Sequence, residues 1–168
     1  DADELWDWWV GKKLADGLHL VGSPKMDGFR CVLSHDKGKV SIWFEDTAQE
    51  RSNTPMLSSL VSSLRSLPSF VLDGEFMVSQ SSKLLARTEI LSVLSGRLPA
   101  DPYIALFDLM YWNGEDYSTK PYSERLSQLS AIRLPPLLHM VEHRPITDKP
   151  SFTAVSKWAA AQPGSEGL

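Results

Sequence analysis

Lys25 is the residue in this sequence whose type and surroundings most directly indicate covalent chemistry. The segment 23–30 reads SPKMDGFR, so an aspartate, a glycine and an arginine follow the lysine at fixed offsets. A lysine amine is a nucleophile only when it is deprotonated, a state that partial burial or a cationic neighbour favours. Gly28 allows the backbone to approach a ligand closely, and the Arg30 guanidinium can donate several hydrogen bonds at once. An exposed lysine at a turn is the competing interpretation of so short a pattern.

Three further segments place carboxylates or an aromatic ring beside strand-like neighbours. Residues 73–75 read DGE after an apolar run, residues 105–111 read ALFDLMY, and residues 166–168 read EGL. Each segment also has a purely structural interpretation: a β-turn at 73–75, a core aromatic at Phe107 and a chain end at Glu166. Taken one at a time, these structural interpretations are the simpler ones.

Several common catalytic patterns are absent from the sequence. It has no glycine-rich phosphate loop ending in Lys-Ser or Lys-Thr, no dinucleotide-binding glycine fingerprint, no Cys/His set at metal spacing and no Gly-x-Ser-x-Gly elbow. The single cysteine, Cys31, cannot form an internal disulfide and is interpreted as a small buried hydrophobic residue. No apolar run is long enough to span a membrane, and the acidic N-terminus is unlike a signal peptide, so a cytoplasmic location is expected.

The elements that must position these residues follow from hydrophobic periodicity and turn residues. Strands are expected over residues 30–34, 40–44, 70–72, 76–78, 103–110 and 138–142, with turns at 36–38, 73–75 and 113–114. Helices are expected over 2–15, from 53–55 to 64, over 88–94, from Ser123 to about 132 and from Ser151 to about 161. Because the strands lie in hairpin-like pairs and do not alternate strictly with helices, the predicted class is α+β with antiparallel sheets and flanking helices.

Three tryptophans lie in the first predicted helix. Trp6, Trp8 and Trp9 could form a platform for base stacking. The preferred interpretation is an amphipathic helix packed into the core, because two of the three tryptophans share its apolar face. Gly17 is expected to end this helix.

The pattern Lys-x-Asp-Gly-x-Arg at 25–30 resembles the first motif of the covalent nucleotidyltransferases, which include ATP-dependent DNA ligases, RNA ligases and mRNA capping enzymes. Residues 73–75 resemble the third motif of that family, 105–111 resemble the next, and 166–168 resemble the fourth. The four motifs follow in the family's order over nearly the whole chain, and this agreement outweighs the structural interpretation of each. The first motif, and FDLMY followed by Asn-Gly, are most similar to bacterial and archaeal ATP-dependent DNA ligases, particularly the ligase domain of bacterial end-joining enzymes.

The resemblance implies the nucleotidyltransferase fold and a reaction with ATP in three phosphoryl transfers. Lys25 would take AMP from ATP and pass it to a nucleic-acid 5′-phosphate, after which a 3′-hydroxyl would displace the AMP and seal the nick. The resemblance assigns nucleotide binding to Lys25, Asp27, Gly28, Arg30, Glu75 and Phe107, and Mg²⁺ or Mn²⁺ binding to Glu166 and Glu75. In this assignment Arg30 contacts the ribose, and the Phe107 ring stacks on the base.

Departures from the family pattern bear on these expectations. Ser23 stands where a glutamate that reads adenine is common, which leaves base selectivity open. Glu45 lies just after the second strand of the first hairpin, where an arginine is common, and Arg51 is only a distant substitute. The fifth motif, with lysines for the α-phosphate, and an OB domain are expected beyond Leu168. Residues 1–168 are therefore predicted to be an adenylation domain that is incomplete at its C-terminus.

The net charge of −4 predicts little electrostatic attraction between these residues and nucleic acid. The expected partners of the longer protein are nicked double-stranded DNA and further domains of the same chain, in a monomer that acts at the nucleoid without contacting a membrane. DNA repair, recombination or replication would be its setting. Residues 1–168 alone are predicted to bind nicked DNA weakly and not to seal it. An RNA ligase, and a degenerate module that binds a nucleotide or a partner without catalysis, are the alternatives.

Overall fold

The computed structural model describes residues 2–45, 48–80, 83–95 and 100–168. Within it the chain forms two compact units, one made of Asp1–Met26 with Val141–Leu168 and the other of Asp27–Met140. Each unit has a hydrophobic cluster of its own. The single adenylation domain expected over residues 1–168 stays a prediction.

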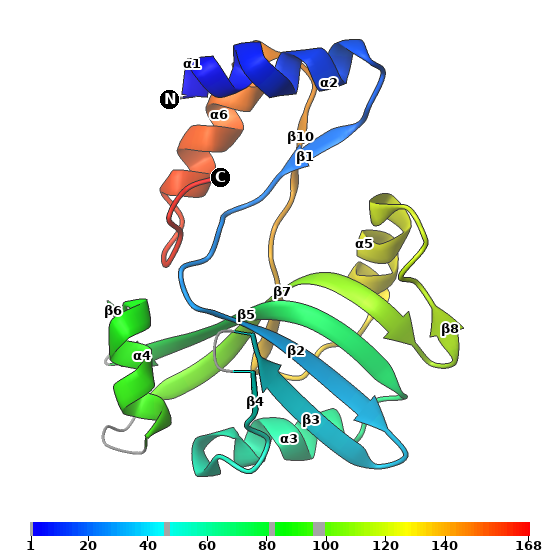
Figure 1. Cartoon of the computed structure of the whole chain (residues 1–168), viewed down its shortest axis with the longest axis vertical. Coiled ribbons are helices and arrows are strands. Elements are labelled where there is room, and N and C mark those ends of the chain that lie inside the picture. The colour runs from blue at the N-terminus through cyan, green and yellow to red at the C-terminus, as the bar shows by residue number, and fades with distance from the viewer. Residues whose placement is uncertain (1, 46–47, 81–82, 96–99) are drawn as a thin grey trace. The chain divides into compact units, whose positions relative to one another are not determined.

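The larger unit, Asp27–Met140, is built on one eight-stranded sheet (Figure 1). Its strands are β2 (Phe29–Asp36), β3 (Lys39–Phe44), β4 (Gln49–Glu50), β5 (Phe70–Gln80), β6 (Lys83–Leu84), β7 (Asp101–Trp112), β8 (Glu115–Asp116) and β9 (Leu138–Met140). They pair in the order β4-β3-β2-β5-β7-β8, with β6 also on β5 and β9 on β7. Among the described strands β9 runs parallel to its neighbour β7 and the others pair antiparallel. This largely antiparallel sheet confirms the predicted α+β class.

The β2–β3 hairpin forms where the sequence predicts it. Lys37 and Gly38 make its turn with φ angles of 47° and 81°, the left-handed conformation that a two-residue hairpin turn requires. Along β2 every second side chain is buried, and Cys31 is among the buried set. Burial raises the pKa of the Cys31 thiol well above its ordinary value, so this residue is the inert hydrophobic side chain that was predicted.

The prediction of a β-turn at residues 73–75 is wrong, because Phe70–Gln80 is one continuous strand, β5. Asp73 and Gly74 pair with β2 on one side and with β7 on the other. Their turn-forming residue types are overridden by this two-sided pairing. A Cβ atom on Gly74 would lie 2.8 Å from the carbonyl oxygen of Ala105 in β7, so a glycine is needed here for close packing of two strands.

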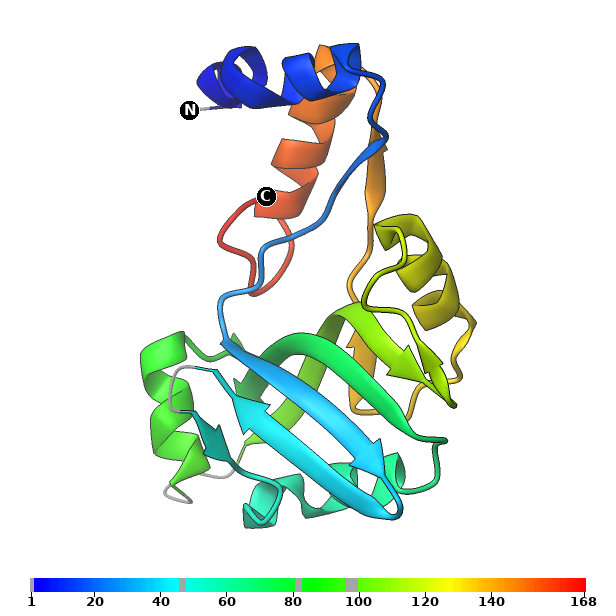
Figure 2. The ribbon, with the colours of Figure 1, turned by 45° about the vertical axis from the view of Figure 1, so that its right-hand side comes forward.

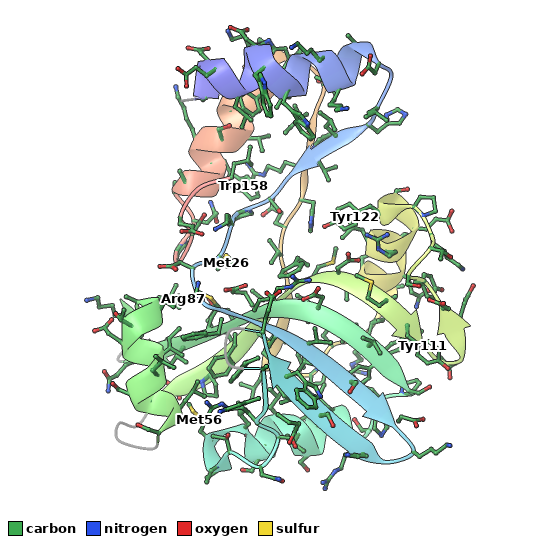
Figure 3. All side chains as sticks on the ribbon, viewed as in Figure 1. Met26, Met56, Arg87, Tyr111, Tyr122 and Trp158 are labelled. Carbon is green, nitrogen blue, oxygen red and sulfur yellow. The ribbon has the colours of Figure 1, made fainter. Side chains whose placement is uncertain are left out.

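Helices cover the larger unit at three places. They are α3 (Ser58–Leu64), entered through the short 3₁₀ helix η2 (Pro55–Leu57), α4 (Arg87–Leu94) and α5 (Tyr122–Ala131). Figures 1 and 2 show α3 beneath the β2–β3 hairpin and α5 beside β7. On α4, the Arg87 guanidinium lies 5.0 Å from the centre of the Phe29 ring (Figure 3). The cap of α5 lies two residues earlier than predicted, at Pro121 and not at Ser123, so the helix begins at Tyr122.

The smaller unit combines an N-terminal helical segment, a two-stranded sheet and a C-terminal helix. Its elements are α1 (Ala2–Leu5), the π-helical turn η1 (Trp6–Val10), α2 (Gly11–Ala15), β1 (Leu20–Gly22), β10 (Arg144–Ile146) and α6 (Lys149–Ala160). The helical segment ends before Gly17, whose φ is +81°, as predicted. No strand was predicted at β1 or β10, which are only three residues each and pair antiparallel with one another.

Of the three N-terminal tryptophans, Trp6 alone packs into the core of the smaller unit. Its ring centre lies 5.7 Å from that of Phe152 on α6. Trp8 and Trp9 are 71% and 42% exposed. The prediction that two of the three tryptophans pack on the core is therefore wrong, because the face of the helical segment that meets this cluster carries Trp6, Val10 and Leu14 and leaves Trp9 outside.

The start of α6 also differs from its prediction. Asp148, and not Ser151, caps this helix, since the Asp148 carboxylate accepts a 2.8 Å hydrogen bond from the Ser151 backbone N–H. Further along α6, the Arg144 guanidinium lies over the ring of Trp158 (Figure 3), 3.9 Å from the centre of that ring. In the described residues we find no helix that has both the length and the apolar character needed to cross a membrane.

The core of the larger unit should be sensitive at Phe76, which is fully buried and lies 5.1 Å from Phe44 between ring centres. Phe76→Ala is expected to lower the free energy of unfolding by about 3–5 kcal/mol, because the vacated space cannot refill. Leu91→Ala on the exposed face of α4, where the side chain is 48% exposed, should change it by less than about 0.5 kcal/mol. Urea denaturation of both variants measures the difference. Equal losses would place Phe76 outside the packed core.

Candidate functional site

Lys25 follows β1 in the smaller unit, and its backbone is held by the segment 165–167. Its N–H donates to the carbonyl of Gly167 and its carbonyl accepts from the N–H of Glu166, both at 2.8 Å. Met26 forms an isolated antiparallel bridge with Ser165. Two segments that are distant in sequence, and that carry the first and fourth motifs, are thus joined by strand-like hydrogen bonds.

The Lys25 and Glu166 side chains meet as an ion pair between Nζ and Oε1. The lysine side chain is 66% exposed and the glutamate side chain 44%. The surroundings of the amine are therefore solvent and a carboxylate, and the partial burial and cationic neighbour considered from the sequence are not what surrounds it. The amine is accessible, and the group that it contacts is one that a metal ion also prefers.

Gly28 lies in the larger unit, immediately before β2, against the backbone of β5. Its N–H donates a 3.0 Å hydrogen bond to the carboxylate of Glu75. A Cβ atom on Gly28 would lie 2.3 Å from the carbonyl oxygen of Phe76 and 2.6 Å from the sulfur of Met77. The need for glycine here thus arises from close contact with β5, and the same contact fixes the Glu75 side chain beside the first motif.

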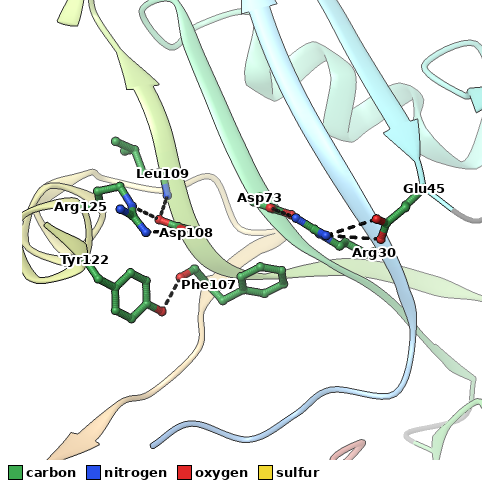
Figure 4. A network of polar contacts seen from close by, with 8 residues as sticks. All are labelled: Arg30, Glu45, Asp73, Phe107, Asp108, Leu109, Tyr122 and Arg125. Atoms are coloured by element: carbon green, nitrogen blue, oxygen red, sulfur yellow. Dashed lines mark hydrogen bonds and ion pairs between the residues drawn. The ribbon is translucent and has the colours of Figure 1, made fainter. Parts of the chain in front are cut away.

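The Arg30 guanidinium is bound between two carboxylates on the exposed face of the sheet (Figure 4). Its Nε and Nη2 donate to the two oxygens of Asp73 at 3.2 and 2.7 Å. Its Nη1 donates to Glu45 at 3.3 and 3.4 Å. The hydrogen bonds and charge of Asp73, followed by the charge of Glu45, raise the pKa of Arg30. Asp73 is buried, whereas the Arg30 and Glu45 side chains are 48% and 62% exposed.

Phe107 is the extra residue of a β-bulge in β7. The register passes from Asp73 opposite Asp108 to Gly74 opposite Leu106, so Phe107 and Asp108 together face one residue of β5. A bulge of this kind turns a side chain out of the regular alternation. Figure 4 shows the half-buried Phe107 ring on the face of the sheet that carries the Arg30–Asp73 pair.

Side chains from α5 hold this bulge in place (Figure 4). The Tyr122 hydroxyl donates to the carbonyl of Phe107 at 2.9 Å, and burial raises the pKa of Tyr122 to about 12, so it stays a neutral donor at neutral pH. Arg125 donates to both oxygens of Asp108, from Nε at 2.8 Å and from Nη2 at 3.0 Å. Asp108 also accepts from the backbone N–H of Leu109 at 2.8 Å.

The supporting roles of Asp73, Asp108, Tyr122 and Arg125 were not predicted from the sequence. A signal was present, because Asp108 is a charged residue inside an otherwise apolar strand and such a residue needs a buried partner. Arg125, in the next helix, was the available cation. Glu45 was noted as a departure from the family pattern, but its pairing with Arg30 could not be read from the sequence.

The predicted site residues fall into two groups. Lys25 and Glu166 lie together in the smaller unit. Asp27, Gly28, Arg30, Glu75 and Phe107 lie in the larger unit, where contacts join Gly28 to Glu75 and strand pairing places Arg30 opposite Glu75. Among the residues that the structure describes, no cluster of three or more His, Cys, Asp or Glu is arranged as a metal site. Glu166 and Glu75 each offer carboxylate oxygens, the donor type that fits Mg²⁺ or Mn²⁺.

Comparison with known proteins gives the same family at the level of sequence. The family described as ATP dependent DNA ligase domain matches residues 16–168. DNA ligase C of Mycobacterium tuberculosis is 31% identical over 117 residues, which are 63% of this chain and 31% of that protein. The DNA ligase of Saccharolobus solfataricus is 25% identical over 167 residues, 90% of this chain and 27% of that protein. The chain therefore spans about a third or less of the length of these relatives.

Solved structures share the fold. The chain resembles a mycobacterial DNA ligase D complexed with ATP and MES, with a TM-score of 0.62 and 24% identity over 83% of this chain and 44% of the other. It also resembles the ligase domain of LigD from M. tuberculosis, with a TM-score of 0.63 and 23% identity over 86% of this chain and 48% of the other.

The sheet, its flanking helices and these likenesses define the α+β nucleotidyltransferase fold of DNA ligases. The chain belongs to the family of ATP-dependent DNA ligase domains, as an adenylation domain related to bacterial DNA ligase C and to archaeal DNA ligases. The resemblance drawn from its motifs is confirmed.

The contact between Asp108 and Arg125 should be important for stability, because their side chains are only 12% and 18% exposed. Arg125→Met is expected to lower the free energy of unfolding by about 3–5 kcal/mol, since it leaves a buried carboxylate without its cation. Arg133→Met, the same change at an exposed position, should cost less than about 0.5 kcal/mol. Urea denaturation compares them. If Arg125→Met and Arg133→Met lower the free energy of unfolding equally, the Arg125 contact does not hold α5 to β7.

Proposed function

We propose that this domain attaches AMP from ATP to the Nζ atom of Lys25. The observation that carries the proposal is the placement of Lys25 within a complete Lys-x-Asp-Gly-x-Arg motif. Its backbone is fixed by segment 165–167 and its amine is exposed beside Glu166. A fixed backbone limits the arc that the amine can sweep, which supports an in-line approach to phosphorus.

The first transfer forms a bond between Lys25 Nζ and the α-phosphorus of ATP and breaks the bond from that phosphorus to the β-phosphate oxygen. Pyrophosphate leaves with the electron pair, and the amine gives up a proton. An oxygen of a DNA 5′-phosphate then displaces the lysine from the same phosphorus. In the last transfer a 3′-hydroxyl attacks the 5′-phosphate, forms the phosphodiester and releases AMP.

The ribose and base would lie over the exposed face of the sheet in the larger unit. Arg30 and Glu75 face each other across the β2–β5 pairing, so a guanidinium and a carboxylate are available to sugar hydroxyls. Phe107 supplies an aromatic face beside them, on a bulge that Tyr122 and Arg125 keep fixed. Stacking on a ring tolerates any base, which agrees with the absence of the common adenine-reading glutamate at Ser23.

Glu166 in the smaller unit and Glu75 in the larger one would each offer carboxylate oxygens to Mg²⁺ or Mn²⁺. When bound, the ion supplies positive charge to the phosphoryl oxygens. The Glu166 carboxylate contacts the Lys25 amine. Withdrawal of that carboxylate from Lys25 would leave the amine without its contact to Glu166, so Glu166 can influence the position of the nucleophile as well as hold a cation.

The longer protein would seal nicks in double-stranded DNA, with an OB domain and the lysines of the fifth motif supplied by other parts of its chain. DNA is preferred to RNA as the sealed strand because the sequence relatives are DNA ligases. DNA repair, recombination or replication would be the setting. The net charge of −4 of these residues supports DNA binding that is provided mainly by other parts of the longer protein.

One observation favours a second candidate, a module that binds a nucleotide or a partner without catalysis. Arg30, the side chain proposed for the ribose, already donates to both Asp73 and Glu45. An arginine saturated by carboxylates has fewer donors left for a ligand. An intact Lys25 paired with Glu166 favours the catalytic proposal.

Covalent labelling tests the nucleophile. The full-length protein is expected to become labelled by α-³²P-ATP with Mg²⁺, and Lys25→Ala should abolish the label. Lys12→Ala, at an exposed lysine of α2, is the matched control and should keep it. A label that survives in Lys25→Ala would remove this residue from its role. A wild-type protein that binds ATP but takes no label would favour the non-catalytic module.

Nucleotide affinity tests Phe107. Phe107→Ala should weaken ATP binding by about 1–3 kcal/mol, the usual value of one base–aromatic stack. Phe107→Leu keeps most of the apolar volume but lacks the π face. It should weaken ATP binding nearly as much as Phe107→Ala does. Calorimetric titration gives both affinities, with circular dichroism as the check on folding. Unchanged affinity in the folded Phe107→Leu variant would assign the ring a packing role instead.

A further inference from the structure

A shallow hollow lies over the β2–β3 hairpin, beside the Arg30–Glu45 pair but on the side of it away from Phe107. It measures about 310 Å³, within the range of small-molecule sites. Its lining residues are Arg30, Val32, Trp43, Phe44, Glu45 and Ala48. Trp43 gives it an aromatic wall and is 48% exposed, although the alternate residues of β3 are buried.

Trp43 lies inside the sheet and not along a bare edge. It pairs with Val32 of β2 on one side and with Glu50 of β4 on the other. A role in shielding an unpaired edge is therefore excluded. A large exposed aromatic at a paired position lacks a packing explanation beyond its contact with Val32, which is worth a few tenths to one kcal/mol.

The register places Trp43 on the face of the sheet that carries the proposed nucleotide site. Trp43 is opposite Val32, Val32 is opposite Asp73, and Asp73 faces the bulge containing Phe107. Three strand spacings separate the two aromatic residues, about 14 Å. The Arg30–Asp73–Glu45 ion pairs lie between them. The face therefore has two separate aromatic surfaces, too far apart for one base to touch both.

The charges and hydrogen-bonding groups at the rim of the hollow indicate which kind of ligand it can bind. Arg30 and Glu45 together contribute no net charge there, so a phosphate gains little at this position. Both side chains are about half exposed, and they place hydrogen-bond donors and a carboxylate acceptor side by side next to the indole. A planar ring that carries an exocyclic amine matches this arrangement: its face stacks on Trp43 and its amine donates to Glu45.

We propose that this hollow binds a nucleobase of the acceptor nucleic acid, stacked on Trp43 and read by Glu45 through an exocyclic amine. The identity of the acceptor rests on the proposed function; the hollow itself does not. The proposal also accounts for Glu45, which replaces an arginine common in related proteins. The hydrogen bonds from Arg30 hold the Glu45 carboxylate at the rim of the hollow, where both residues are part of the lining.

The test uses the 168-residue chain and three 5′-phosphorylated trinucleotides, made of deoxycytidine, of deoxyuridine and of abasic units. Titrations followed by the indole N–H signal of Trp43 in NMR spectra detect even millimolar affinities. Deoxycytidine should bind about five- to a hundred-fold more tightly than the abasic probe. It should bind about two- to ten-fold more tightly than deoxyuridine, which has no exocyclic amine.

Two variants separate stacking from base reading. Trp43→Leu, which keeps apolar volume, should bring deoxycytidine down to the affinity of the abasic probe, measured at the amide signals of Val32 and Phe44. Glu45→Ala should remove the preference for deoxycytidine over deoxyuridine while the preference over the abasic probe persists.

Equal affinity of the wild-type chain for the base-containing and abasic probes overturns the proposal, and so does unchanged binding by Trp43→Leu. Labelling at Lys25 is an independent readout. If Lys25 is labelled but the base-containing probes bind no better than the abasic probe, only this inference is contradicted. If the base-containing probes bind better but Lys25 is not labelled, the proposed function is contradicted.

Discussion

The two-sided hydrogen bonding of β5 is the constraint on which the larger unit depends. This strand pairs with β2 along one edge and with β7 along the other, and both pairings run through Asp73, Gly74 and Glu75. Because β5 is continuous there, Glu75 lies opposite Arg30 and its carboxylate receives the N–H of Gly28. The glycines at 28 and 74 permit backbone contacts that any side chain would block. Residues 28–30 of the first motif, the segment 73–75 and the segment 105–111 thus depend on one strand for their alignment.

The electrostatics of the exposed face follow from that alignment. Asp73 is buried by strand pairing and holds Arg30, which also binds Glu45 just after the second strand of its own hairpin. On the other side, Asp108 holds Arg125 and so ties α5 to the bulge that presents Phe107. Each arginine satisfies a carboxylate that would be costly to leave unpaired. The aromatic surfaces at Trp43 and Phe107 are therefore separated by groups that cannot easily move.

The sequence predicted most of what local pattern controls. The β2–β3 hairpin, α4 and the Asn113-Gly114 turn depend on short-range residue types, and they appear at the expected residues. Residues 73–75 were mispredicted because their turn-like composition is overridden by pairing with distant strands. The short strands β1 and β10, and the exposure of Trp9, depend on which distant surface is available. The contact between Arg30 and Glu45 is of a different kind, because it lies within the β2–β3 hairpin, where the Glu45 N–H also donates to the Arg30 carbonyl.

A crystal structure of the domain after incubation with ATP and Mg²⁺ would test the central claim most directly. We predict electron density continuous from Lys25 Nζ to the phosphorus of AMP, with the adenine stacked on Phe107 and the ribose beside Arg30 and Glu75. AMP bound to another residue, or a nucleotide lying away from the exposed face of β2, β5 and β7, would contradict that claim.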